Sequence, residues 1–105
     1  MERTIPLGEV FATRELEFTH SNGRKETVQV LVGRPVCVDQ SQQEWWCPYL
    51  VKAESFEKQH RSIGGDSMQA LILSTQIIST QLHALARQHN GTFTYLGESN
   101  LHFPE

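Results

Sequence analysis

One stretch of this sequence constrains the fold more than any other, an apolar pattern that runs from Ser67 to about His89. Its apolar side chains recur at intervals of three, four and seven residues, at Met68, Leu71, Ile72, Ile78, Leu82, Leu85 and Ala86. This spacing predicts an α-helix with one buried face. About 23 helical residues span roughly 35 Å, enough to cross a small sheet. Because Leu73, Ile77 and Ala84 make a second face partly apolar, either the sheet curls around the helix or that face meets another subunit.

The segments before the helix predict an antiparallel hairpin. In residues 9–19, Leu16 and Phe18 alternate with polar side chains, as in a half-buried strand. Residues 27–32 alternate in the same way, with valine at every second position. Asn22-Gly23 lies between them and supplies the positive φ angles of a tight turn.

Further elements follow this hairpin along the chain. Arg34-Pro35 ends the second strand, because proline cannot donate to a ladder, and Val38 to Glu44 reads as an exposed loop. Trp45 to Ala53 is aromatic and β-branched enough for a third strand, where Pro48 indicates an edge or a bulge. Residues 54–62 are compatible with strand, loop or both.

A short last strand is predicted at Thr92 to Leu96, after Asn90-Gly91 ends the helix. The tail from Gly97 to Glu105 contains Leu101 and Phe103, and it either docks or frays. We therefore expect an α+β fold: an antiparallel sheet of about four strands, with one long helix packed across one face.

Length and composition exclude several classes of protein. The 105 residues fit a single domain, 1–105. The net charge is -3 and the basic residues are scattered, so the clustered lysines and arginines of nucleic-acid binders are missing. The chain lacks a membrane-length apolar run and the pattern of a secretory signal. Cys37 and Cys47 make no disulfide framework. We expect a cytoplasmic protein that contacts neither nucleic acid nor membrane.

The segment Gly64-Gly65-Asp66-Ser67 opens the predicted helix and has three interpretations. In the first, Asp66 caps the helix and Gln69 returns the bond of a capping box, while the glycines let the chain turn sharply. In the second, the glycine amides bind an anion or another small ligand. In the third, Ser67 carries a phosphopantetheine arm, as in carrier domains, although carriers are four-helix bundles. The first interpretation needs only local physics, and we favour it.

Two neighbouring tryptophans mark a predicted contact surface. In a strand, Trp45, Cys47 and Tyr49 share one face, while Trp46 and Pro48 share the other. One tryptophan must therefore point away from the helix. An exposed tryptophan or tyrosine is a natural anchor for a protein partner, unless a loop or the tail covers it. Our candidate binding residues are Trp45, Trp46, Tyr49, Gly64, Gly65, Asp66 and Ser67.

No motif in the sequence assembles a catalytic or metal site. His83 and His89 are about 120° apart around the helix, and neither cysteine has a partner at zinc-ligand spacing. Ser67 and Cys47 have no histidine placed by a motif that would activate them. We expect no cofactor and no metal, and the chain reads as a protein other than an enzyme.

Three short motifs resemble an uncharacterised family of small bacterial proteins of about a hundred residues, a domain of unknown function. They are Trp45-x-Cys47-x-Tyr49, Gly64-x-Asp66-Ser67-x-Gln69-Ala70-Leu71 and Tyr95-Leu96-Gly97, within residues 45–104. The resemblance implies bacterial origin and a shared fold but no activity. We therefore expect a non-enzymatic bacterial protein that acts through protein–protein contact or self-association as a homodimer. Small-ligand or anion binding at Gly64–Ser67 and a carrier role for Ser67 are the alternatives.

Overall fold

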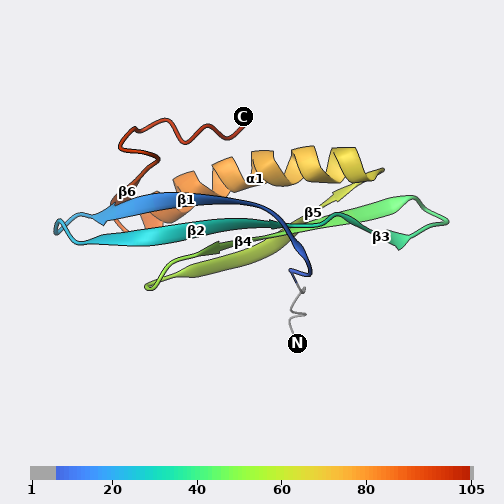
Figure 1. Ribbon diagram of the computed structural model, residues 1–105, viewed down its shortest axis with the longest axis horizontal. Helices are drawn as coiled ribbons and strands as arrows, with labels where there is room; N and C mark the ends of the chain where they lie inside the picture. Colours follow the sequence, from blue (N-terminus) through green and yellow to red (C-terminus); the bar gives the residue numbers. More distant parts are fainter. Residues whose placement is uncertain (1–6, 105) are drawn as a thin grey trace.

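The computed structural model describes residues 7–104, which form six strands and one helix. In chain order these are β1 (Val10–His20), β2 (Lys25–Gly33), β3 (Val36–Asp39), β4 (Glu44–Lys52), β5 (Glu57–Gly64), α1 (Ser67–Gln88) and β6 (Gly91–Thr94). All strand pairs are antiparallel, and α1 lies along one face of the sheet (Figure 1). The predicted α+β class and the single covering helix are confirmed, but the expectation of about four strands is wrong.

Strand β4 explains the two extra strands, because it pairs along both of its edges. Strand β5 pairs with β4 over its whole length, from Lys52↔Glu57 to Trp45↔Gly64. Two strands share the other edge of β4. Strand β3 pairs with its first part, from Glu44 to Trp46, and β2 pairs with its last part, from Tyr49 to Lys52. Residues 38 and 39, predicted as part of an exposed loop, belong to β3. The ambiguous residues 54–62 hold a turn followed by most of β5.

Pro48 is tolerated in this central strand for a local reason. It pairs with Arg61 on the β5 side. On the opposite edge of β4, the register leaves Pro48 between the last residue paired with β3 and the first paired with β2. The break in the neighbouring strand at Arg34-Pro35 creates this gap. The prediction of an edge or a bulge at Pro48 is therefore wrong, although a residue without an N–H fits where the ladder is interrupted.

The core lies between the sheet and α1, and small side chains set how closely they approach. The buried residues of the helix are Ala70, Ser74, Ile78, Leu82 and Leu85. Ser74 Oγ donates to the carbonyl of Cys47 at 2.6 Å, and Ser62 Oγ donates to that of Ala70 at 2.5 Å. The predicted buried face was correct at Ile78, Leu82 and Leu85 but wrong at Met68 and Ile72, which are exposed. The helix begins over β5 with Ala70 inward, because only small residues fit there.

The C-terminal tail docks rather than frays through residue 104. Leu101 and Phe103 pack against the core beside α1 and are partly buried. Arg14 Nη1 of β1 donates to the carbonyls of Leu101 at 3.0 Å and His102 at 2.8 Å. Its guanidinium carbon also lies 4.9 Å from the ring centroid of Phe103. Figure 1 shows the tail turning back from β6 and running beside the helix.

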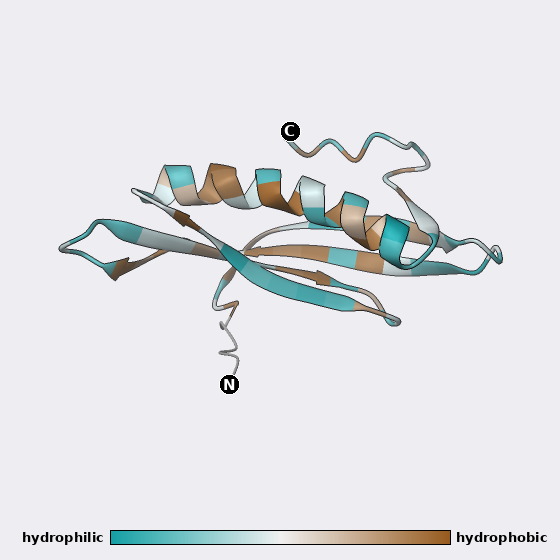
Figure 2. Ribbon diagram, turned by 180° about the vertical axis from the view of Figure 1, so that it is seen from behind, coloured by the Kyte–Doolittle hydropathy of each residue, from teal (hydrophilic) through white to brown (hydrophobic). Residues whose placement is uncertain are grey.

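The molecule is elongated, with principal extents of 51 × 31 × 21 Å. Strand β3 and the adjoining end of β4 project beyond the start of α1 (Figure 1). In Figure 2 the projecting β3 has a hydrophobic colour, and hydrophobic and hydrophilic segments alternate along the helix. Apolar residues therefore lie at an end of the molecule that the helix does not cover.

Candidate functional site

Most of the exposed large apolar side chains lie at one end of the molecule, where β1 begins, β5 ends and α1 starts. Seven of the eight in the described chain are found there: Val10, Phe11, Val36, Val38, Ile63, Met68 and Ile72. The eighth, Leu96, belongs to the tail. Scattered apolar residues are normal on a protein surface, but an exposed group of them is less common and needs an explanation.

A groove of about 690 Å³ lies within this end, between the start of β1 and the first turns of α1. Phe11, 60% exposed, and Met68, 65% exposed, both line it. The lining also includes an ion pair, in which Arg34 Nη1 lies 3.3 Å from Glu9 Oε2. The remaining lining residues are Val10, Pro35, Trp45, Ser67 and Leu71. We call this feature the helix-start groove.

Trp45 also lines a second hollow, of about 750 Å³, with Cys37, Gln40, Gln43, Gly65 and Asp66. Its indole therefore lies between the helix-start groove and this hollow. The structure thus brings together Trp45, Gly65, Asp66 and Ser67 of the predicted binding residues. The sequence predicted these residues as two separate motifs, and the β4–β5 pairing makes them neighbours.

The helix start is capped by its own side chains. Asp66 Oδ1 accepts the N–H of Gln69 at 2.7 Å, which confirms Asp66 as the N-cap. Gln69 Oε1 accepts the N–H of Gly65 at 2.6 Å, one residue before the cap. Gly64 is buried against Ala70, where it has no room for a side chain. This segment therefore has a full structural explanation as a tight, capped entry into α1.

The other two predicted aromatic residues lie elsewhere. Tyr49 is fully buried in the core beneath α1, and its hydroxyl has no hydrogen-bond partner. Burial raises the pKa of Tyr49 to about 12. Trp46 points to the opposite face of the sheet, as the alternation along the strand predicted for one of the two tryptophans. Tyr49 and Gly64 therefore support the fold, while Trp46 belongs to a different surface from Trp45.

Arg61 of β5 covers the indole of Trp46, a contact that sequence reasoning missed. The guanidinium carbon lies 4.1 Å from the ring centroid, and Trp46 Nε1 donates to Glu44 Oε2 at 2.7 Å. The two residues lie near each other only because β4 and β5 pair with Pro48 opposite Arg61. A register that depends on two distant segments leaves no trace in the local pattern.

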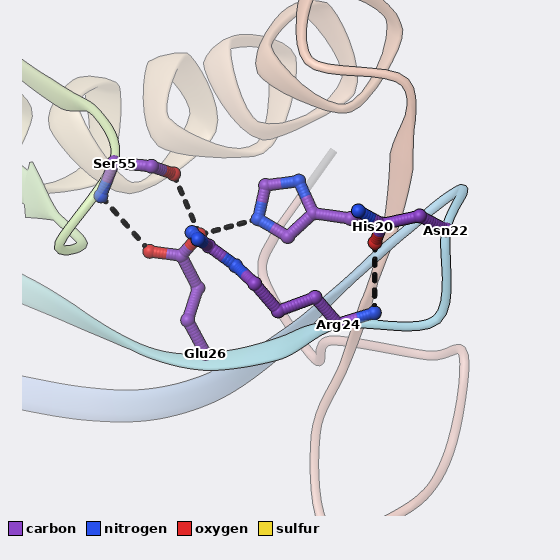
Figure 3. Close-up of polar contacts among 5 residues, drawn as sticks. All are labelled: His20, Asn22, Arg24, Glu26 and Ser55. Carbon is purple, nitrogen blue, oxygen red and sulfur yellow. Dashed lines mark hydrogen bonds and ion pairs between the residues drawn. The ribbon is translucent and has the colours of Figure 1, made fainter.

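A second cluster missed by the sequence lies around Glu26, near the β1–β2 turn (Figure 3). His20 Nε2 contacts Glu26 Oε2, which also accepts Arg24 Nη2 at 3.2 Å and Ser55 Oγ at 2.6 Å. Glu26 Oε1 accepts the N–H of Ser55 at 3.0 Å. Burial raises the pKa of Glu26, but the hydrogen bonds from Ser55, His20 and Arg24 outweigh it, and the pKa falls to about 2. A carboxylate with all these donors holds elements together and has little capacity for proton transfer.

Two further properties of the described residues bear on function. Among residues 7–104, no three His, Cys, Asp or Glu side chains are grouped closely enough to hold a metal ion. Over the same residues, no helix is both long and apolar enough to cross a membrane.

The fold and the exposed end define an α+β protein with one helix on an open antiparallel sheet and an uncovered apolar surface at the helix start. The chain belongs to the domain family of unknown function DUF6968, whose model matches residues 12–105. This match supports the resemblance to an uncharacterised domain and extends it to the N-terminal hairpin. The comparisons found no match among curated proteins and none among solved structures.

Proposed function

We propose that this chain is a non-enzymatic protein that acts through protein–protein contact, with the helix-start groove as its contact surface. The observation that carries the proposal is the gathering of exposed apolar side chains at one end, with Phe11 and Met68 lining a groove. Solvent-exposed apolar groups of this size are stabilised when a partner covers them. Trp45 within the groove is of the residue type that dominates binding energy at interfaces.

An unpaired strand edge beside the groove favours a partner that binds as an extended segment. Strand β1 pairs with β2 along its length, but β6 pairs only with Glu17 to His20 of β1. Residues 10–16 of β1 therefore have one edge without a strand partner in the described chain. An added strand would gain main-chain hydrogen bonds there and place side chains in the groove. A second copy offers the same edge, so the proposal includes a symmetric homodimer.

A photo-crosslinking amino acid at position 68 tests the contact surface in the cell of origin. We expect a covalent adduct, and its mass distinguishes a second copy from another protein. The matched control carries the same amino acid at position 96, because Leu96 is also exposed but lies outside the groove. Equal adducts from both positions, or none from position 68, would contradict the proposal.

Light scattering over a concentration series tests self-association separately. We expect a monomer–dimer equilibrium for the wild-type chain and for Leu96→Ser. The double variant Phe11→Ser/Met68→Ser should remain monomeric, because it loses the apolar surface of the groove. A wild-type chain that stays monomeric at every concentration would remove the homodimer from the proposal and leave a different protein as the partner.

The two alternative functions have less support. For an anion or small ligand at Gly64–Ser67, the amides of Gly65 and Gln69 already bond to side chains of the chain itself, and the Asp66 carboxylate would repel an anion. For a phosphopantetheine carrier, the described residues hold one helix and not a four-helix bundle. Intact mass after incubation with a phosphopantetheinyl transferase and coenzyme A tests the carrier function directly. We expect no added mass on Ser67.

The setting of the protein is part of the same proposal. Cys37 and Cys47 are both free thiols, which suits a reducing compartment. Together with the resemblance of the Trp-x-Cys-x-Tyr and Gly-x-Asp-Ser motifs to small bacterial proteins, this supports a bacterial protein of the cytoplasm.

A further inference from the structure

A row of apolar side chains crosses the outer face of the sheet, the face opposite α1. The strand register places Val36 of β3 beside Trp46 of β4, and Trp46 beside Ile63 of β5. Val36 is 47% exposed and Ile63 is 51% exposed. Figure 1 shows the helix and the tail on the other side of the sheet. This outer row is therefore apolar surface at the projecting end that the helix and tail leave uncovered.

The outer row contains one cation, and that cation has no ionic partner in the described chain. The Arg61 guanidinium stacks on the Trp46 indole, and none of the ion pairs among residues 7–104 includes it. Arg61 Nε is buried and has no hydrogen-bond partner. The nearest acidic side chain along β4, Glu44, bonds to the indole N–H instead.

This arrangement favours a carboxylate from outside the chain. A guanidinium without an ionic partner gains a charge-assisted hydrogen bond when an outside carboxylate reaches its accessible N–H groups. A guanidinium stacked on an aromatic ring still presents N–H groups at its edge, in a geometry that matches a carboxylate. Tryptophan and arginine are also among the residues enriched at the positions that contribute most of the binding energy of an interface. The charge and the apolar row together select an acidic segment that also carries apolar side chains.

We propose that Val36, Trp46, Ile63 and Arg61 form a second docking surface, which binds an acidic and apolar segment of a partner protein. The carboxylate of that segment bonds to Arg61, and its apolar side chains cover Val36 and Ile63. Because Trp45 and Trp46 lie on opposite faces of the sheet, this surface is separate from the helix-start groove. It does not depend on the function proposed for that groove.

Selection of random peptides displayed on phage against the immobilised full chain provides the test. We expect the enriched peptides to carry Asp or Glu next to Leu, Ile, Phe or Trp. Synthetic copies, measured by fluorescence anisotropy, should bind the Arg61→Gln variant at least about tenfold more weakly than the wild type. Arg87→Gln, which removes the same charge from the exposed last turn of α1, should leave their affinity unchanged.

One further variant and one further measurement complete the test. Phe11→Ser/Met68→Ser should bind the peptides as the wild type does, because the groove is not involved, and circular dichroism should show that Arg61→Gln remains folded. Enriched peptides without an acidic residue, no enriched peptide at all, or equal affinity for Arg61→Gln would each overturn the proposal. A dimer of the wild-type chain that Arg61→Gln abolishes would assign the outer row to a second copy and would also overturn it.

Discussion

Gly64 and Gly65 are adjacent, yet the structure gives them different roles. A Cβ on Gly64 would lie 2.5 Å from the backbone nitrogen of Ala70, whereas the nearest atom to a Cβ on Gly65 is the mobile Gln69 Oε1 at 3.3 Å. We expect Gly64→Ala to lower the free energy of unfolding by about 1–3 kcal/mol, because the helix backbone must move away from β5.

Urea denaturation of Gly64→Ala and Gly65→Ala side by side checks this difference. Gly65→Ala should change the stability much less, since a side-chain oxygen can move aside. Equal losses in the two variants would show that the pair acts through chain flexibility instead of close packing.

Tyr49 predicts a loss of stability in alkaline solution. Its pKa is raised from 10 to about 12, because burial favours the neutral hydroxyl. In the unfolded chain the hydroxyl ionises near pH 10. The contribution of Tyr49 to the free energy of unfolding is therefore complete below that pH and is lost as the pH rises to 12. Tyr49→Phe should remove this part of the pH dependence. At neutral pH it should leave the stability unchanged or raise it by up to about 1 kcal/mol, since the deleted hydroxyl has no partner.

The matched control for this experiment is Tyr95→Phe. The ring of Tyr95 lies 4.8 Å from the Arg14 guanidinium carbon, and phenylalanine keeps a ring in that place. Chemical denaturation of the three chains between pH 9 and pH 12 measures the effect. A Tyr49→Phe chain that lost stability with the same slope as the wild type would contradict the assignment.

At the scale of elements, Glu26 connects the two strands of the β1–β2 hairpin to Ser55, which lies 29 residues further along the chain. Its carboxylate joins β2 to His20 of β1 and to Ser55 in the turn between β4 and β5. The pKa of Glu26 is lowered from 4.5 to about 2. Its contribution to the free energy of unfolding is therefore complete above pH 4.5 and is lost as the pH falls to 2. We expect Glu26→Gln to lower the stability at neutral pH by about 1–3 kcal/mol and to flatten the acid limb of the stability profile.

Glu17→Gln is the control for the acid experiment. Glu17 pairs with Lys25 at 3.7 Å, but both side chains are exposed, and such pairs contribute little. Equilibrium denaturation from pH 7 to pH 2 compares the variants. If Glu17→Gln flattened the acid limb as much as Glu26→Gln, the effect would come from net charge and not from the buried carboxylate.

The elements themselves were predicted unevenly. The helix was expected from Ser67 to about His89 and runs from Ser67 to Gln88, because capping and periodicity are local properties. Strands β1 and β2 were predicted for the same reason. The prediction of the buried face of α1 was wrong in its first turns, where Met68 and Ile72 are exposed. The spacing of apolar residues identifies a helix. Which face of that helix packs against the sheet depends on the small residues of the sheet beneath it.

At the scale of the whole molecule, the open sheet leaves two surfaces on opposite faces. The helix-start groove lies on the side of α1 and contains Trp45, while the outer row contains Trp46. Alternation along a strand predicted that one of the two tryptophans would point away from the helix. It did not predict Arg61 on the indole, nor Val36 and Ile63 on either side, since those contacts need the pairing of three strands.

The sequence by itself determined the α+β class, the hairpin, the capped helix and the opposite directions of Trp45 and Trp46. Each of these depends on residues close together in the chain, where backbone preference and side-chain period act directly. Only the tertiary structure decided that β3 and β5 pair with β4, that Tyr49 is buried, and that Glu26 binds Ser55. These features depend on contacts between distant segments, whose register is selected by the packing of the whole core.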